Sequence, residues 1–211
     1  MSHLVFSGVW IPIITPFRAG RVDHAALQAL VKRLAADGVA GLVVCATTGE
    51  APLLTDAERF DVLGTVRAAT TLPLVMGASG TTAGEVLRRA DAAMAHAPDA
   101  FMVTPPPYLR PSQDALRAFF TTIADGLPAP LMLYDIPART GVRIELETML
   151  ALAAHPRIVA LKDCGGRPGP VKALLAARGE CANELRAPLT TASTALTERL
   201  LALVSALPAR A

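Results

Sequence analysis

The chain has 211 residues, 52% of them hydrophobic and 18% charged, and its formal net charge is +2. A chain this apolar buries enough surface to offset the entropy lost on ordering, which excludes a disordered or low-complexity protein. The small net charge and the 4% of aromatic residues argue against a nucleic-acid-binding protein. The length suits one large domain or two small ones.

The sequence shows neither a membrane span nor a secretion signal. No stretch approaches the roughly 18 uninterrupted apolar residues that cross a bilayer, so we expect a soluble protein. The N-terminus lacks a basic region and a small-residue cleavage site. The three cysteines, Cys45, Cys164 and Cys181, are odd in number and far apart, which favours a reducing compartment. We therefore expect a cytoplasmic protein.

Six short runs rich in Val, Ile and Leu recur along the chain. They cover residues 10–15, 41–46, 74–77, 100–104, 131–134 and 158–162. Each run is apolar through its length, as strands buried on both faces are. The segments that follow them place apolar residues at helical spacing over residues 23–37, 55–69, 83–95, 112–124, 145–154 and 170–178. Asp23, Thr55 and Ser112 can cap the first turns of three of these helices. We thus predict six strand–helix units, with a further helix over residues 194–207.

The spacing of these units predicts a parallel sheet. Strand starts lie about 30 residues apart, the length of one βα unit. An open doubly wound sheet would carry an early phosphate loop, but the Gly-Ala-Ser-Gly of residues 77–80 matches neither a dinucleotide fingerprint nor a Walker loop. A (β/α) barrel instead gathers its chemistry at the carboxyl ends of several strands. Polar residues stand at those ends here: Thr47, Thr48, Ser79, Thr104, Tyr134 and Lys162. We therefore predict an α/β fold of the TIM-barrel type.

The predicted barrel is incomplete. Eight units of about 30 residues need roughly 240 residues, and only six units are recognisable. We find no seventh or eighth strand after residue 162. The sequence therefore predicts a partial barrel over residues 1–178 and a C-terminal helical segment over residues 179–211.

A single amine ends the sixth predicted strand. Residues 158–162 read Ile-Val-Ala-Leu-Lys. An ammonium group loses hydration in such a place, which favours the neutral amine that forms a Schiff base with a carbonyl. The alternative is a lysine that extends from the strand end into solvent. The spacing alone leaves both interpretations of Lys162 open.

Other polar residues near the strand ends have a catalytic and a structural interpretation. Thr47 and Thr48 could bind a carboxylate or relay a proton, or could satisfy amides in an ordinary turn. The phenol of Tyr134 could exchange protons, or could be buried for packing. Arg139 could bind a substrate carboxylate through two parallel donors, or could form an ion pair at the surface. Tyr108 follows three prolines that hold it in place, for function or as part of a rigid connector.

The cysteines and histidines add no clear site. Cys164 could be a reactive thiol or, if it is buried, an inert one. The four histidines, His3, His24, His96 and His155, show no metal-ligand spacing. We therefore predict no metal site.

Taken together, these residues resemble the dihydrodipicolinate synthase and N-acetylneuraminate lyase family, class I pyruvate aldolases on a (β/α)₈ barrel. The matching pieces are Thr15-Pro16-Phe17, Thr47-Thr48-Gly49-Glu50, Thr104-Pro-Pro-Pro-Tyr108 with Arg110-Pro111-Ser112, Tyr134-Asp-Ile-Pro-Ala-Arg-Thr-Gly141 and Leu161-Lys162-Asp163. They stand in the family's order and spacing from about residue 7 to residue 166. Each piece alone is weak, but the joint match is specific.

The resemblance implies a role for each matching residue. Lys162 would form the Schiff base with pyruvate, and Tyr134 would be the acid/base phenol. Thr47 would link Tyr134 to Tyr108, the tyrosine that such enzymes contribute across a dimer interface. Thr48 would hold the pyruvate carboxylate.

The resemblance also bears on substrates and partners. Arg139 looks like the arginine that, in the synthase branch, receives the carboxylate of aspartate semialdehyde, so we expect a synthase of lysine biosynthesis. An aldolase for 2-keto-3-deoxy sugar acids or for N-acetylneuraminate is the alternative. No metal or organic cofactor is expected, because Lys162 supplies the electron sink. The role of Tyr108 implies a homo-oligomer. The composition gives no reason to expect nucleic-acid or membrane partners.

The chain departs from the family pattern in two places. Asn183-Glu-Leu-Arg-Ala-Pro-Leu-Thr190 resembles the family's carboxyl-terminal segment, so the chain passes from the sixth unit to the last helix. The first and sixth strands would then be open edges, and a non-catalytic remnant becomes a third hypothesis. Asp56, Arg59 and Thr81 stand where lysine-regulated members have histidines and an asparagine, so we do not expect inhibition by lysine.

Overall fold

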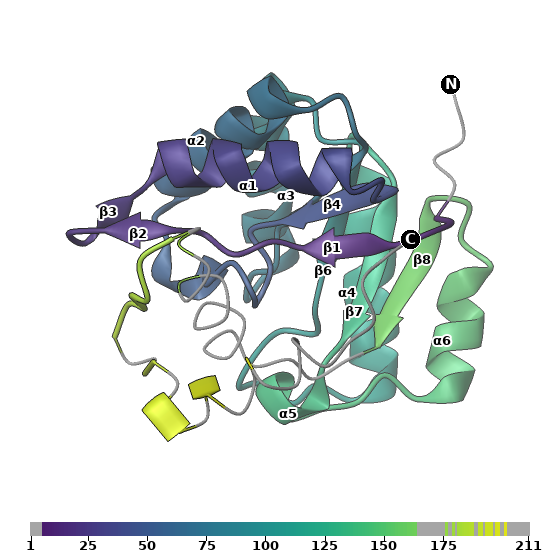
Figure 1. The fold of residues 1–211 in the computed structure, drawn as a ribbon. Helices are drawn as coiled ribbons and strands as arrows, with labels where there is room; N and C mark the ends of the chain where they lie inside the picture. The colour runs from purple at the N-terminus through teal and green to yellow at the C-terminus, as the bar shows by residue number, and fades with distance from the viewer. Residues whose placement is uncertain are drawn as a thin grey trace.

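The computed structural model describes residues 6–163 and, beyond them, residues 176, 179, 181–187, 190–191, 193–195, 197–198 and 201. Its main feature is a parallel six-stranded sheet whose strands lie side by side in chain order (Figure 1). The strands are β1 (Trp10–Pro12), β4 (Gly41–Val44), β5 (Leu74–Gly77), β6 (Ala100–Val103), β7 (Leu131–Asp135) and β8 (Ile158–Asp163). The six predicted strands and their parallel pairing are confirmed.

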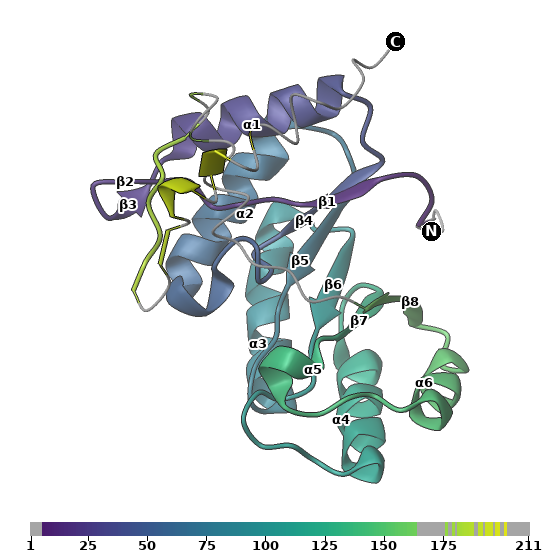
Figure 2. The same cartoon turned by 60° about the horizontal axis from the view of Figure 1, so that its bottom comes forward.

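Helices follow the strands and pack on one another outside the sheet (Figure 2). They are α1 (His24–Ala36), α2 (Asp56–Ala69), α3 (Ala83–Ala93), α4 (Gln113–Gly126) and α6 (Leu146–Ala153). The three predicted caps are confirmed, since Asp23, Thr55 and Ser112 each accept a hydrogen bond from a first-turn amide of their helix. The chain therefore alternates strand and helix, as the spacing predicts.

Strand alternation divides the apolar residues into two cores. The larger core lies between the sheet and the helices and includes Leu27, Val62 and Phe120. The smaller core lines the inner face of the curled sheet, where Val75, Met102 and Tyr134 lie among the other inward residues. The inner face is therefore a packed surface, and its polar groups lie at the carboxyl ends of the strands.

Burial differs between the central and the edge strands. Every residue of β4, β5, β6 and β7 is buried, as predicted. Residues of β1 are only partly buried, and in β8 burial alternates, with Val159 41% and Leu161 44% exposed. Burial along the whole strand is therefore a wrong prediction for β1 and β8, because an edge strand has one neighbour instead of two.

Within the described part of the chain the sheet does not close, because β1 and β8 are its two ends and do not pair with each other. No further parallel strand follows β8 among the described residues. This is the six-stranded partial barrel that the sequence predicts. The predicted helix over 170–178 and the predicted domain boundary at 178 lie outside the described residues, apart from position 176, as does Cys164.

The structure adds short elements that periodicity does not reveal. They are the antiparallel hairpin of β2 (Phe17–Arg18) and β3 (Arg21–Val22), the 3₁₀ turns η1 (Ala51–Leu53) and η2 (Met94–His96), and the one-turn helix α5 (Pro137–Thr140). Elements this short do not complete one apolar repeat, so a search for periodic patterns passes over them. Two of them, η1 and α5, lie in loops at the carboxyl ends of strands.

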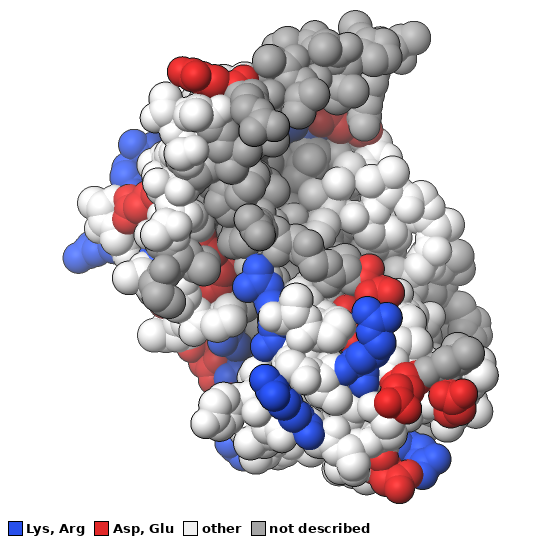
Figure 3. All heavy atoms as spheres, turned by 90° about the horizontal axis from the view of Figure 1, so that it is seen from below, with Lys and Arg blue, Asp and Glu red and all other residues white. Residues whose placement is uncertain are grey.

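None of the helices within the described residues combines the length and the apolar character that crossing a bilayer requires. On the face that Figure 3 shows, the described basic and acidic side chains are interspersed.

Candidate active site

The register of β7 and β8 brings an amine and a phenol together. Tyr134 and Lys162 are directly paired positions of these two parallel strands, and so are Met132 and Ala160 two residues earlier. Side chains two residues apart share a face of the sheet, so both functional groups lie on the inner face. Nζ of Lys162 lies 4.6 Å from the centroid of the Tyr134 ring. Tyr134 is 3% exposed and Lys162 is half-buried, so the amine stands in a sheltered place beside the phenol.

A hydroxyl from the loop after β4 joins this pair. Oγ1 of Thr47 lies 3.4 Å from the phenol oxygen of Tyr134, and Thr47 is half-buried. Thr48, the next residue, is also half-buried. Three of the predicted site residues, Lys162, Tyr134 and Thr47, are thus gathered at one end of the sheet from three different strand ends.

The loop that carries Thr47 is tightly wound. The backbone amide of Glu50 donates to the carbonyl of Thr47 at 3.1 Å, and Oγ1 of Thr15 donates to the carbonyl of Gly49 at 2.7 Å. Cys45 (φ +53°) and Glu50 (φ +57°) both adopt left-handed backbone conformations. Such conformations cost about 1–3 kcal/mol each outside glycine and gather at functional sites. The loop therefore keeps its shape only because its surroundings hold it.

The close approach of β5 to this loop requires a glycine. A Cβ atom on Gly77 would lie 2.1 Å from the carbonyl oxygen of Cys45, closer than any side chain allows. The two strand ends can therefore lie together only with glycine at position 77.

A cavity of about 260 Å³ opens at the carboxyl ends of β4 to β7. Thr47, Tyr134 and Arg139 line it, together with Ser79 and Thr104. Arg139 is exposed and belongs to α5, which places its guanidinium at the rim of the cavity. The cavity is large enough for a small organic acid and offers it hydroxyl, phenol and guanidinium groups.

Tyr108 does not join the other predicted residues within one chain. It has a left-handed backbone (φ +73°) and its side chain is 92% exposed. The neighbouring Arg110 lies against Gly141, where an added Cβ would be 2.7 Å from the Arg110 Nε. Tyr108 is also not among the residues that line the cavity.

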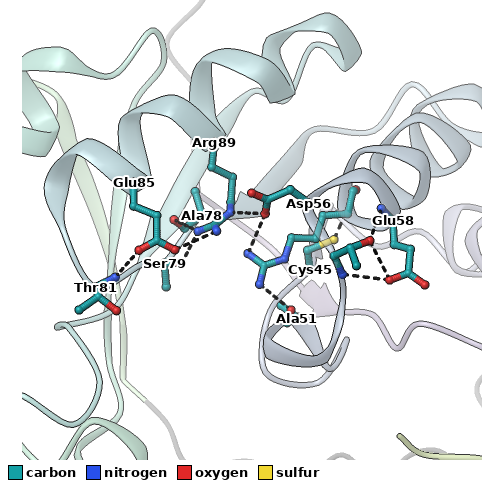
Figure 4. Close-up of polar contacts among 11 residues, drawn as sticks. Cys45, Ala51, Asp56, Glu58, Ala78, Ser79, Thr81, Glu85 and Arg89 are labelled. Carbon is teal, nitrogen blue, oxygen red and sulfur yellow. Dashed lines mark hydrogen bonds and ion pairs between the residues drawn. The ribbon is translucent and has the colours of Figure 1, made fainter.

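Two buried arginines, Arg59 and Arg89, support the loops of the site and were not among the predicted site residues. Figure 4 shows Arg89 with the carboxylates of Asp56 and Glu85. Nε of Arg89 donates to Oδ1 of Asp56 at 2.7 Å, its Nη1 donates to the Ser79 carbonyl at 2.7 Å, and its Nη2 donates to Oε1 of Glu85 at 3.0 Å. Nη2 of Arg59 donates to the Ala51 carbonyl at 2.7 Å. Arg59 and Arg89 therefore tie the loops after β4 and β5 to helices α2 and α3.

Electrostatics within this arginine cluster favour the ionised carboxylates. The hydrogen bond from Arg89 is the largest cause that lowers the pKa of Asp56. Burial lowers the pKa of Arg59, and the neighbouring positive Arg89 lowers it further. The spacing of Glu85 and Arg89, four residues apart on one helix face, was a signal in the sequence for half of this cluster.

Cys45 also lines the cavity, but it is not a nucleophile. Burial raises the pKa of its thiol to about 12, and the sulfur lies 3.7 Å from the carbonyl oxygen of Arg59. The thiol therefore stays protonated at neutral pH and is inert. Among the residues that the structure describes, no three His, Cys, Asp or Glu side chains gather as metal ligands.

A parallel (β/α) sheet with its polar groups at the strand ends defines a protein of the TIM-barrel class. The sequence profile of the Dihydrodipicolinate synthetase family matches residues 5–168, most of the chain. The chain therefore belongs to this family.

Individual relatives agree with the family match. The chain is 46% identical over 155 residues to 4-hydroxy-tetrahydrodipicolinate synthase 1 of Streptomyces coelicolor, a match that covers 72% of this chain and 51% of that protein. It spans about half the length of the curated relatives that it matches.

Solved structures share the fold. A chloride-inhibited dihydrodipicolinate synthase from Acinetobacter baumannii, solved in complex with pyruvate, superimposes with a TM-score of 0.74 at 32% identity, over 84% of this chain and 62% of that one. Dihydrodipicolinate synthase from Aquifex aeolicus gives a TM-score of 0.85 at 24% identity, over 95% and 97% of the two chains. At that identity the second likeness concerns the fold alone.

Proposed function

We propose that the chain is a Schiff-base-forming pyruvate lyase or synthase of the 4-hydroxy-tetrahydrodipicolinate synthase type, which joins pyruvate to aspartate semialdehyde in lysine and diaminopimelate biosynthesis. One observation carries the proposal: the register of β7 and β8 pairs Tyr134 with Lys162 on the inner face, with Nζ 4.6 Å from the ring centroid. An amine and a proton-transferring phenol at this distance are the two groups that the first half of the reaction needs.

The reaction starts on the amine. Neutral Nζ of Lys162 attacks the ketone carbon of pyruvate, and loss of one water molecule gives an iminium. The iminium withdraws electrons from the methyl group, so removal of a methyl proton, assisted by Tyr134, gives an enamine. The enamine carbon then bonds to the aldehyde carbon, the aldehyde oxygen takes a proton, and water releases the product from Lys162. No metal or organic cofactor is required, because the iminium is the electron sink.

The remaining groups orient the substrates. In this proposal Thr47, 3.4 Å from the Tyr134 oxygen, orients the phenol for proton transfer. Thr48 holds the pyruvate carboxylate. Arg139, at the cavity rim, receives the carboxylate of aspartate semialdehyde through two parallel hydrogen bonds.

Self-association belongs to the same proposal. The Tyr108 side chain is 92% exposed in its own chain, so it can enter the proton relay only from a neighbouring copy. A homo-oligomer is therefore the proposed active form, and the cytoplasm its proposed location.

Borohydride trapping tests the proposed activity. Reduction in the presence of pyruvate should fix the ketone to Lys162 and raise the protein mass by one reduced pyruvate adduct. Lys162→Arg keeps the positive charge but cannot form the imine, so it should show no adduct. A wild-type chain that binds no pyruvate covalently would instead be a non-catalytic remnant. The open edges of β1 and β8, which do not pair with each other in the described chain, favour that second candidate.

Arg139 tests the identity of the aldehyde. Arg139→Ala should lower turnover with aspartate semialdehyde by about 100-fold, because a charge-assisted bidentate contact is lost. Pyruvate trapping should be unchanged. Equal turnover of the variant and the wild type would point to an aldolase for 2-keto-3-deoxy sugar acids or for N-acetylneuraminate.

A further inference from the structure

Residues 181–187 lie against the opposite end of the chain. The yellow segments of Figure 1 run beside the hairpin of β2 and β3, and Figure 2 shows the same neighbourhood. The backbone amide of Gly20, in the turn between β2 and β3, donates to Oε1 of Glu184 at 3.0 Å. Nη2 of Arg186 donates to the carbonyl of Gly20 at 3.2 Å, and its guanidinium carbon lies 4.4 Å from the centre of the Phe17 ring. These contacts join residues more than 160 positions apart in the sequence.

Arg186 also reaches the loop that carries Thr47. Its backbone amide donates to Oε2 of Glu50 at 3.1 Å, and its Nη1 donates to the Leu53 carbonyl at 2.7 Å. Its two terminal nitrogens bind both carboxylate oxygens of Glu58, at 3.0 and 2.5 Å. The hydrogen bond from Arg186 is the largest cause that lowers the pKa of Glu58 to about 2. One side chain thus connects the β2–β3 hairpin, the turn η1 and the first turn of α2.

These contacts fall where the loop needs support. Glu50 is 1% exposed and has a left-handed backbone, which is costly for a residue with a side chain. Its amide is bonded to the carbonyl of Thr47, and Leu53 closes η1 with a hydrogen bond to Glu50. Fixing Glu50 and Leu53 therefore fixes the place of the Thr47 hydroxyl beside Tyr134.

We propose that Arg186 is a positioning residue, which holds residues 46–54 in the conformation that presents Thr47 and Thr48 to the substrate. The link to catalysis rests on the proposed function, whereas the link to the loop does not. A guanidinium suits this task, because its planar fork binds a carboxylate at two points while a further donor reaches a carbonyl.

Hydrogen exchange on the full-length chain tests the link to the loop. Arg186→Ala should make the amides of residues 46–54 exchange about tenfold faster than in the wild type, with the amides of α4 unchanged. Arg117→Ala is the matched control, because Arg117 pairs with Asp114 on α4 and both side chains are exposed. Exchange in residues 46–54 that is no faster in Arg186→Ala than in Arg117→Ala would overturn the proposal.

Pyruvate trapping then tests the link to catalysis. Arg186→Ala should raise the half-saturating pyruvate concentration about tenfold. Arg186→Lys should restore part of the affinity, because an ammonium still donates to Glu58 but cannot make the two-point contact. Glu58→Gln keeps a side chain able to cap α2, and its half-saturating pyruvate concentration should lie between those of Arg186→Ala and Arg186→Lys. If Arg186→Ala does not fold, Glu58→Gln and Arg186→Lys together test the proposal. A lysine variant as impaired as the alanine variant would contradict the positioning role.

The two proposals fail in different ways. If the wild type traps no pyruvate, the proposed function fails, while the exchange rates still decide whether Arg186 holds the loop. If pyruvate is trapped normally by Arg186→Ala, the positioning role fails and the proposed function stands.

Discussion

The strand pair β7–β8 and the loops after β4 and β5 meet at the Tyr134 phenol, which lines the cavity, but their residues are held in place in different ways. In the strand pair, Tyr134 and Lys162 meet because the register of two neighbouring strands places them opposite each other. In the loops, positions depend on the side chains of Arg59, Arg89 and Arg186, which come from helices and from the distant carboxyl-terminal region. The amine and the phenol are therefore placed by local sheet geometry, whereas the loops around them are held by the hydrogen bonds and ion pairs of arginine side chains.

Removing the phenol oxygen tests the strand pair and should give the largest effect. Tyr134→Phe keeps the ring beside Lys162 but removes the hydroxyl that we propose as the proton-transfer group. Turnover should fall by about 10²–10⁴-fold, the usual contribution of a general acid or base, while the fold is retained. Steady-state kinetics with circular dichroism as the check on folding would measure this. A loss below about threefold would remove Tyr134 from the mechanism.

Breaking the arginine cluster tests the loops. Asp56→Ala leaves Arg89, whose side chain is 8% exposed, with Glu85 as its one remaining carboxylate partner in the cluster, although Asp56 itself is 53% exposed. We expect the free energy of unfolding to fall by about 2 kcal/mol, the worth of a hydrogen bond to a charged group, measured by urea denaturation. Asp114→Ala is the matched control, because Asp114 is 87% exposed and should cost less than about 0.5 kcal/mol. Equal losses in the two variants would show that the cluster adds nothing to loop stability.

Acid should weaken the contact between the carboxyl-terminal segment and α2. The pKa of Glu58 is lowered from 4.5 to about 2, so its stabilisation is present above pH 4.5 and is lost as the pH falls from 4.5 toward about 2. Since its side chain is 28% exposed, we expect a loss of about 2 kcal/mol rather than the full linkage value. Urea denaturation at about pH 6 and about pH 3 would measure it. Glu58→Gln should remove the share of this pH dependence that belongs to Glu58, while the carboxylates of Asp23, Asp56 and Glu85, whose pKa values are also lowered, keep theirs. An unchanged profile would contradict the assignment.

The hydroxyl of Thr47 joins the two regions and should give the smallest effect. Thr47→Val keeps the shape and removes a contact of 3.4 Å with the Tyr134 oxygen. Turnover should fall about fivefold, as expected for a hydrogen bond worth about 1 kcal/mol. Thr65→Val, whose hydroxyl contacts His24 in the helical layer, should leave turnover unchanged and serves as the control. No change in Thr47→Val would mean that Tyr134 is oriented by other groups.

The sequence predicted the strands because continuous apolar runs are short-range patterns. Position at the ends of these runs drew attention to Lys162, Tyr134 and Thr47 but left a structural interpretation open, and their joint role as site residues came from the resemblance to the family. The exposure of residues in β8 could not be predicted in this way, because an apolar run looks the same in an edge strand and in a central one.

What the sequence determined by itself is the order of six βα units and the identity of the groups at their carboxyl ends, because apolar periodicity and strand direction are properties of neighbouring residues. Only the tertiary structure decided that Arg89 of α3 reaches Asp56 of α2, and that Arg186 meets Glu50 and Glu58. Contacts between distant segments depend on which segments pack together, and no spacing along the chain records that. The sequence therefore determines that an amine stands at the end of the sixth strand, and the fold determines which residues surround it.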